Sequence, residues 1–246
     1  MVTLERPPGP RRPFRNAYLG LALLIPLTLL AFFKSYSGGV TFSGRPVTLL
    51  VHLHTALMVL WLLMLVAQAW LIRSRRFQFH RWLGRSSYAL VPIIVIAMLA
   101  ADHESVNLVP GGITPEGARI EVFAWGQLVA FALCWGLAIR YRKQTHLHLR
   151  FMVSTAFAIS TAIVFRIILN WFNWLPGMGS LDGVAAANWM VLTLALLALI
   201  ARDGRTGLKR SPFWVVTVAI GVMHLGFWTF GRTEGWFAFV QWFGSL

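Results

Sequence analysis

Several histidines and one arginine lie inside or beside long apolar stretches, where charged or strongly polar side chains are costly and usually functional. His54, Arg166 and His224 stand within such stretches, whereas His80 and His148 stand near arginine-rich borders. Imidazole nitrogens ligate haem iron and other metals, and a guanidinium pairs with carboxylates. These residues therefore favour a haem or metal site, a substrate or proton site, or a polar cluster that only joins helices.

The composition predicts that a membrane bundle positions these residues. The chain of 246 residues is 57% hydrophobic and 12% charged, whereas a soluble domain carries about 25% charged residues. Its apolar runs reach the roughly 20 residues that a bilayer-spanning helix needs. We expect an all-α, polytopic membrane helix bundle that forms a single domain over residues 1–246. The net charge of +14 does not indicate nucleic acid, because the cations sit in short loops between apolar spans.

The apolar runs predict about seven transmembrane helices. They are Ala17–Phe33, Val47–Ile72, Ser86–Ala101, Glu121–Tyr141, Leu147–Phe172, Gly183–Ala201 and Phe213–Phe230. Residues 1–16 form a basic arm, and residues 102–120, which are rich in glycine and proline, are expected to form a loop. Residues 232–246 are too short to span and carry aromatic side chains that suit a membrane interface.

The distribution of cations predicts the orientation of these helices. Of the 22 lysines and arginines, 17 fall on one side of the predicted spans, four fall on the other, and Arg166 lies within a span. The positive-inside rule then places the N-terminus in the cytoplasm and the C-terminus outside. We expect a multi-pass protein of the bacterial inner (cytoplasmic) membrane, whose basic loops contact anionic lipids at the cytoplasmic face.

The topology brings polar side chains to two depths. His54, Arg166 and His224 fall roughly 8–10 Å below the outer surface at 1.5 Å per residue. His80 and His148 fall near the inner surface, and His148 shares a face of the fifth helix with Arg166, about 27 Å away. Two b-type haems at two depths would carry electrons across the bilayer. In that arrangement His54 and His224 ligate the outer iron beside Arg166, and His80 and His148 are the inner candidates.

The sequence lacks residues and motifs that several other cofactor and metal sites need. The three lysines, Lys34, Lys143 and Lys209, all fall outside the spans, which argues against a retinal Schiff base. Cys134 is the only cysteine, so an internal disulfide and the Cys-x-x-Cys-His haem attachment are both absent. The sequence also lacks a His-Glu-x-x-His zinc motif and a phosphate-binding glycine-rich motif.

Residues of the second to fifth predicted spans resemble an uncharacterised bacterial multi-pass membrane family, the domain of unknown function 2306. The resemblance is carried by His54 through Trp61 to Gln68, by the box His80-Arg81-Trp82-Leu83-Gly84-Arg85-Ser86-Ser87-Tyr88, and by His148-Leu149-Arg150-Phe151-Met152 running to Arg166. It covers roughly residues 50–170, and Phe151 stands where that family more often has tryptophan. The resemblance implies a multi-span membrane fold without an established activity. The histidine-bearing helices are also broadly similar to cytochrome b561-type haem bundles.

Three functions follow as hypotheses, and whether the protein is an enzyme stays open. The first is a haem-b electron-transfer protein or subunit that acts with a quinol or another membrane redox partner. The second is a small-solute or proton-coupled permease that uses Arg166 and His224. The third is a non-catalytic accessory or structural subunit of a larger membrane complex.

Overall fold

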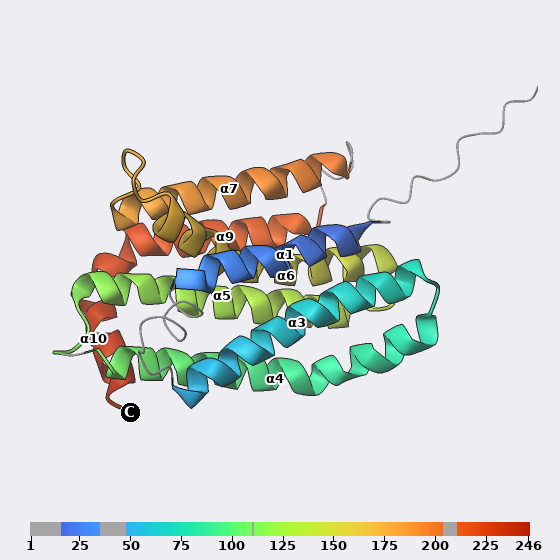
Figure 1. Ribbon diagram of the computed structural model, residues 1–246, viewed down its shortest axis with the longest axis horizontal. Coiled ribbons are helices and arrows are strands. Elements are labelled where there is room, and N and C mark those ends of the chain that lie inside the picture. Colours follow the sequence, from blue (N-terminus) through green and yellow to red (C-terminus); the bar gives the residue numbers. More distant parts are fainter. Residues whose placement is uncertain (1–15, 35–47, 110, 204–210) are drawn as a thin grey trace, which may run out of the picture.

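The chain folds into an all-helical bundle (Figure 1) in a computed structural model that describes residues 16–34, 48–109, 111–203 and 211–246. The described residues form no strand. The long helices are α1 (Ala17–Phe32), α3 (Leu49–Arg73), α4 (Phe77–Asn107), α5 (Pro115–Arg140), α6 (Thr145–Trp171), α7 (Leu181–Arg202) and α9 (Phe213–Trp228). A short 3₁₀ turn, η2 (Phe230–Arg232), leads into α10 (Glu234–Gly244). The predicted basic arm, residues 1–16, lies outside the described residues except for Asn16.

Six of these helices are long and apolar enough to cross a membrane: α3, α4, α5, α6, α7, and α9 together with η2. The first apolar helix, α1, has 16 residues, which is below the usual length of a spanning helix. The prediction of a helical membrane bundle is confirmed at this level, because apolar helices alternate with short polar turns along the described chain.

Two segments are more helical than the sequence suggested. The predicted third span, Ser86–Ala101, lies within a helix of 31 residues that continues through Pro92. His80 therefore lies on the first turn of α4 rather than in a loop. The glycine- and proline-rich stretch 102–120 is also largely helical, because α5 begins at Pro115, where Thr114 Oγ1 accepts a hydrogen bond from the Gly117 amide at 3.1 Å. Proline at the first helical position and threonine before it together favour a helix start.

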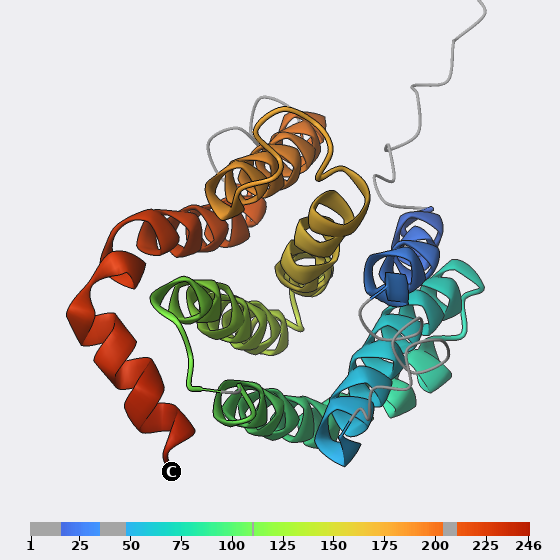
Figure 2. The same cartoon turned by 60° about the vertical axis from the view of Figure 1, so that its left-hand side comes forward.

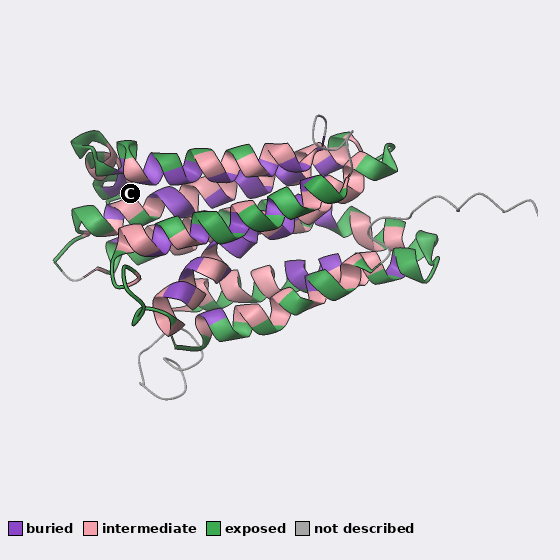
Figure 3. Ribbon diagram, turned by 90° about the horizontal axis from the view of Figure 1, so that it is seen from above, coloured by how far each residue is buried: buried purple, intermediate pink, exposed green. Residues whose placement is uncertain are grey.

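The helices form two groups around α5 and α6 (Figure 2). On one side, α3 and α4 form an antiparallel hairpin, and α1 packs against α3 and α6. On the other side, α7 and α9 pack against each other and against α6, and α9 also packs on α5. The buried residues face the spaces between the helices, and the exposed ones cover the outside (Figure 3). Apolar exposed side chains such as Leu29, Leu60 and Leu194 suit contact with lipid.

Small residues let α6 occupy the centre of the bundle. Ser154 and Thr155 are fully buried, as are Ala156 and Ala158 to within 2%. Small side chains allow close approach of helix backbones in membranes. The hydroxyls do not remain unpaired, since Ser154 Oγ donates to the Arg150 carbonyl at 2.9 Å. The helix that packs through these small residues carries His148 near its start and Arg166 near its end.

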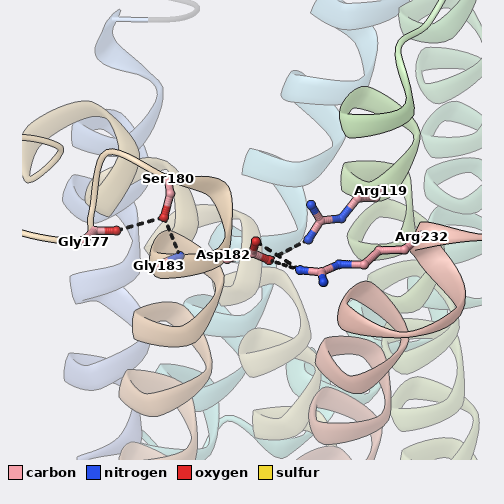
Figure 4. Close-up of polar contacts among 6 residues, drawn as sticks. All are labelled: Arg119, Gly177, Ser180, Asp182, Gly183 and Arg232. Carbon is pink, nitrogen blue, oxygen red and sulfur yellow. Dashed lines mark hydrogen bonds and ion pairs between the residues drawn. The ribbon is translucent and has the colours of Figure 1, made fainter.

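A cluster of charged side chains ties three elements together at the end of the bundle where α7 begins (Figure 4). Asp182 accepts hydrogen bonds from Arg119 of α5 at 2.6 Å and from Arg232 of η2 at 3.0 and 3.1 Å. The neighbouring helix α10 packs on α4 and α5, where Trp236 Nε1 donates to the Ala118 carbonyl at 2.6 Å. The segment predicted to be interfacial and aromatic is therefore a short helix fixed across this end of the bundle.

Candidate functional site

His80 and His148 face each other across the space between α4 and α6. Their ring centroids are 6.5 Å apart, and the two ring planes make an angle of 83°. The α3–α4 turn brings the first turn of α4 beside the first turns of α6. The two histidines predicted for the inner level therefore lie next to each other.

One ring nitrogen of each of these histidines has no hydrogen-bond partner among the described residues. The Nδ1 atom of His148 lies 2.8 Å from the Ala138 carbonyl oxygen. A carbonyl oxygen only accepts, so Nδ1 carries the proton and the lone pair lies on Nε2. This is the arrangement in which a second hydrogen bond orients a ligating histidine. The Nδ1 atom of His80 is buried and has no partner among the described residues.

Both histidines line a cavity of about 1760 Å³ between α1, α3, α4 and α6. This volume exceeds that of an ordinary small-molecule site, which is about 300–1,000 Å³. Its walls are largely apolar, with Leu65 and Met152 among the lining residues. Five arginines also line it: Arg73, Arg75, Arg81, Arg85 and Arg142. The cavity therefore suits a large apolar ligand that carries negatively charged groups.

Other polar groups in the cavity were not singled out by sequence reasoning as site residues. Gln68 is buried, and its Oε1 atom has no partner among the described residues. Arg142 donates to the Tyr88 hydroxyl at 2.5 Å. Arg75 adopts a left-handed backbone conformation with φ of 58°, which is uncommon outside glycine and asparagine. The sequence gives no signal for this conformation, because the turn between Arg73 and Phe77 contains neither glycine nor asparagine.

A second polar group lies at the other end of α6. Arg166 lies with its guanidinium carbon 4.8 Å from the centroid of the Phe32 ring of α1. His54 lies on α3, which packs against α1 as α6 does. Arg166 Nε and His54 Nδ1 are both buried without a hydrogen-bond partner among the described residues. These two residues predicted for the outer level thus lie on the two helices that pack against α1.

His224 is fully buried in a different environment, formed by α5, α7 and α9. Its Nδ1 lies 2.8 Å from the Ile220 carbonyl, which can only accept, so Nε2 accepts from Asn188 Nδ2 at 3.3 Å. The ring also packs against Phe123, with centroids 5.0 Å apart. Both nitrogens are engaged, so the described geometry leaves His224 no lone pair for iron. The expectation of one site containing His54, Arg166 and His224 is not met by these contacts.

The pair of histidines is a smaller donor set than a protein zinc site uses. The described residues contain no group of three or more histidine, cysteine, aspartate or glutamate side chains that could hold a metal ion. Protein zinc sites use three or four such ligands, whereas haem iron takes its four equatorial nitrogens from the porphyrin. The protein then supplies only the axial ligands, and two histidines are enough.

Comparisons with known proteins give no further guidance on this site, because no family model, curated protein or solved structure matches the chain.

Proposed function

We propose that this protein is a haem-b-binding electron-transfer protein of a bacterial cytoplasmic membrane, with His80 and His148 as the axial ligands. The single observation that carries the proposal is the facing pair of histidines in the arginine-lined cavity. With metal–nitrogen bonds of about 2.0 Å, two imidazoles on opposite sides of one iron have ring centres roughly 6 Å apart. The observed separation of 6.5 Å is close to that value.

The remaining features of the cavity support the same ligand. Apolar walls suit a porphyrin face, and arginines pair with carboxylates such as the propionates of haem. Held by His80 and His148, haem b would supply a one-electron redox couple. The hydrogen bond from His148 Nδ1 to the Ala138 carbonyl keeps the tautomer whose Nε2 faces away from that carbonyl. These features therefore support electron transfer.

The topology proposed from the sequence gives this site its location. With α1 as a seventh span and the arginine-rich end in the cytoplasm, the cavity opens at the cytoplasmic face, near anionic lipid headgroups. Electrons would come from a quinol or a membrane redox partner at that level. The basic side chains around the cavity suit an acidic docking surface on such a partner.

An absorption spectrum tests the proposal directly. The full chain, purified from cells supplied with haem, should show a Soret band and a sharp α-band on reduction. His80→Ala and His148→Ala should each remove the six-coordinate spectrum. His146→Ala is the matched control, because this histidine lies two residues from His148 but is exposed; its spectrum should not change. A folded, colourless protein, or two site variants with the spectrum of the unaltered protein, would refute the proposal.

A further inference from the structure

Arg166 carries a charge within a membrane-spanning helix and has no acidic partner among the described residues. The ion pairs found there join Arg119 and Arg232 to Asp182, and Arg150 to Asp203. Arg166 lies five residues before the end of α6 at Trp171, which is about 7.5 Å along the helix axis. Its Nε atom is buried and has no acceptor. An unpaired charge at such a depth is strongly unfavourable.

The contact with Phe32 offsets only part of this cost. The guanidinium carbon lies 4.8 Å from the ring centroid, a geometry in which the ring face attracts the cation. A ring face attracts the charge but accepts no in-plane N–H hydrogen bond. The Nε–H therefore still lacks the acceptor that buried donors almost always have.

His54 adds a second unsatisfied group at the same junction. Its Nδ1 atom is buried without a partner among the described residues, and its helix, α3, packs against α1, the helix that Arg166 contacts through Phe32. A bound oxyanion would accept hydrogen bonds from both residues and neutralise the guanidinium. We propose that Arg166 and His54 bind the oxyanion of a carboxylate or phosphate group at the junction of α1, α3 and α6.

The surroundings point to an oxyanion carried by an acyl-chain amphiphile. Exposed apolar side chains occur on the same helices: Leu30 and Phe33 lie at the end of α1, and Leu53 lies on α3 next to His54. In a bilayer such side chains contact acyl chains, so a headgroup at Arg166 could keep its tail in lipid. A free anion such as inorganic phosphate has the same headgroup chemistry but would have to leave water to reach this depth. The site is independent of the haem cavity, since α6 separates Arg166 from His148 by about 27 Å.

Binding of radiolabelled oleate to the protein in phosphatidylcholine nanodiscs tests the proposal. The unaltered protein should bind oleate saturably, and Arg166→Met should weaken binding by about tenfold or more, because a charge-assisted hydrogen bond is lost. His54→Phe should weaken it by a smaller factor. Lys34→Met is the matched control: Lys34 is an exposed cation at the same end of the bundle, held over Trp171 at 4.5 Å. Its removal should leave oleate affinity unchanged.

Competition identifies the source of the oxyanion. Displacement by lysophosphatidate but not by inorganic phosphate shows a lipid headgroup site, and displacement by both shows a site for free anions; either result supports the oxyanion. If Arg166→Met does not fold, Arg166→Lys and His54→Phe carry the test, with weakened binding expected in both. No saturable binding, or equal affinity in the unaltered protein and every site variant, overturns the proposal. The haem spectrum should be the same in all these variants, so a failure here is distinct from a failure of the proposed function.

Discussion

Arg150 and Asp203 form a two-pronged ion pair that joins the first turns of α6 to the end of α7. Nη2 lies 2.5 Å from Oδ1 and Nε lies 2.8 Å from Oδ2. Ser211, just before α9, donates to Oδ2 at 2.9 Å. Both charged side chains are largely buried, with 13% of Arg150 and 5% of Asp203 exposed. The pair therefore links α6, α7 and the approach to α9 at the arginine-rich end.

The Arg150–Asp203 pair should make stability depend on acid pH. Burial alone would raise the pKa of Asp203, but hydrogen bonds from Arg150 and Ser211 and the charge of Arg150 together hold that pKa below its ordinary value. The unfolded chain, with an aspartate pKa of about 3.9, then takes up the proton first as pH falls. The stabilisation is therefore fully present above that pH and is lost as pH falls through the lower folded value.

Asp203→Asn should lower the free energy of unfolding by about 2–3 kcal/mol at pH 7, the range for hydrogen bonds to charged groups. Thermal unfolding in detergent at pH 7 and at pH 3 measures the effect. The difference between the two proteins should be large at pH 7 and should shrink at pH 3. A difference that is equal at both values would contradict the assignment of the effect to this carboxylate.

Two glycines of α5 should respond oppositely to the same substitution. A Cβ on Gly126 would lie 2.5 Å from Cγ and 3.0 Å from Cβ of Met223, a buried residue of α9, whereas a Cβ on Gly136 would meet nothing within 4 Å. Gly126→Ala should therefore destabilise the protein by about 1–3 kcal/mol through overpacking. Gly136→Ala should be neutral or stabilising by up to about 1 kcal/mol, because alanine favours the helix.

Unfolding of the two glycine variants side by side checks this prediction. In a protein that already carries Met223→Ala, the Gly126→Ala substitution should cost less than it does in the unaltered protein, because the atoms that clash are gone. Equal stabilities for Gly126→Ala and Gly136→Ala would show that α5 and α9 do not approach each other as closely as the structure has it.

The sequence predicted the helices well because the apolar run length that defines a span is a local property. The first span, predicted as Ala17–Phe33, corresponds to α1 at Ala17–Phe32. The sequence did not predict where α4 begins, because the arginines and polar residues from Phe77 onward are typical of a loop. These residues are helical because a helix can extend beyond the apolar layer into water, and no local signal of composition marks where it starts.

The position of a residue along its helix was likewise predictable, but the neighbours of that helix were not. His80 and His148 were assigned to one level, and their rings lie together, with centroids 6.5 Å apart, where the start of α4 approaches the start of α6. His54, Arg166 and His224 were also assigned to one level, yet His224 packs with Phe123 and Asn188 on another side of the bundle. Helix order around a bundle depends on contacts between distant segments, which a single sequence does not encode in its periodicity.

The attachment of α1 should depend on side chains at the end of α6. Trp171 Nε1 donates to the Leu30 carbonyl at 3.0 Å, and Asn170 Nδ2 donates to the Ala31 carbonyl at 3.0 Å. The Leu30 carbonyl also accepts from the Phe33 amide at the end of α1, so the side-chain bonds from α6 add to the capping of this helix end. Trp171→Phe keeps an aromatic ring beneath Lys34 but removes one donor, so α1 should be held less tightly by about 1 kcal/mol.

Amide hydrogen exchange measures the hold on α1. Trp171→Phe should speed exchange in residues 17–32 several-fold and leave exchange in α9 unchanged. Trp174→Phe is the control, because the Nε1 atom of this exposed residue donates within its own turn, to the Trp171 carbonyl. Faster exchange of α1 in both variants, or in neither, would show that the Trp171–Leu30 bond does not anchor this helix.

We expect His224 to stabilise the fold and not to bind a cofactor, whereas His80 and His148 are the proposed ligands. His224→Phe keeps a ring against Phe123 but removes the acceptor for Asn188, a residue that is itself fully buried. An unsatisfied buried amide costs about 1–3 kcal/mol, so this variant should unfold at lower temperature. Its absorption spectrum should match that of the unaltered protein, because both ring nitrogens of His224 are engaged by protein groups.

The double variant His224→Phe, Asn188→Leu completes the test of this buried pair. Replacing both partners with apolar side chains removes the unsatisfied amide, so stability should return toward that of the unaltered protein. A spectrum that changes in His224→Phe while the protein stays folded would instead make His224 a ligand. The hydrogen bond between His224 and Asn188 would then have to open before iron could bind, and the structural role argued from its two engaged nitrogens would be wrong.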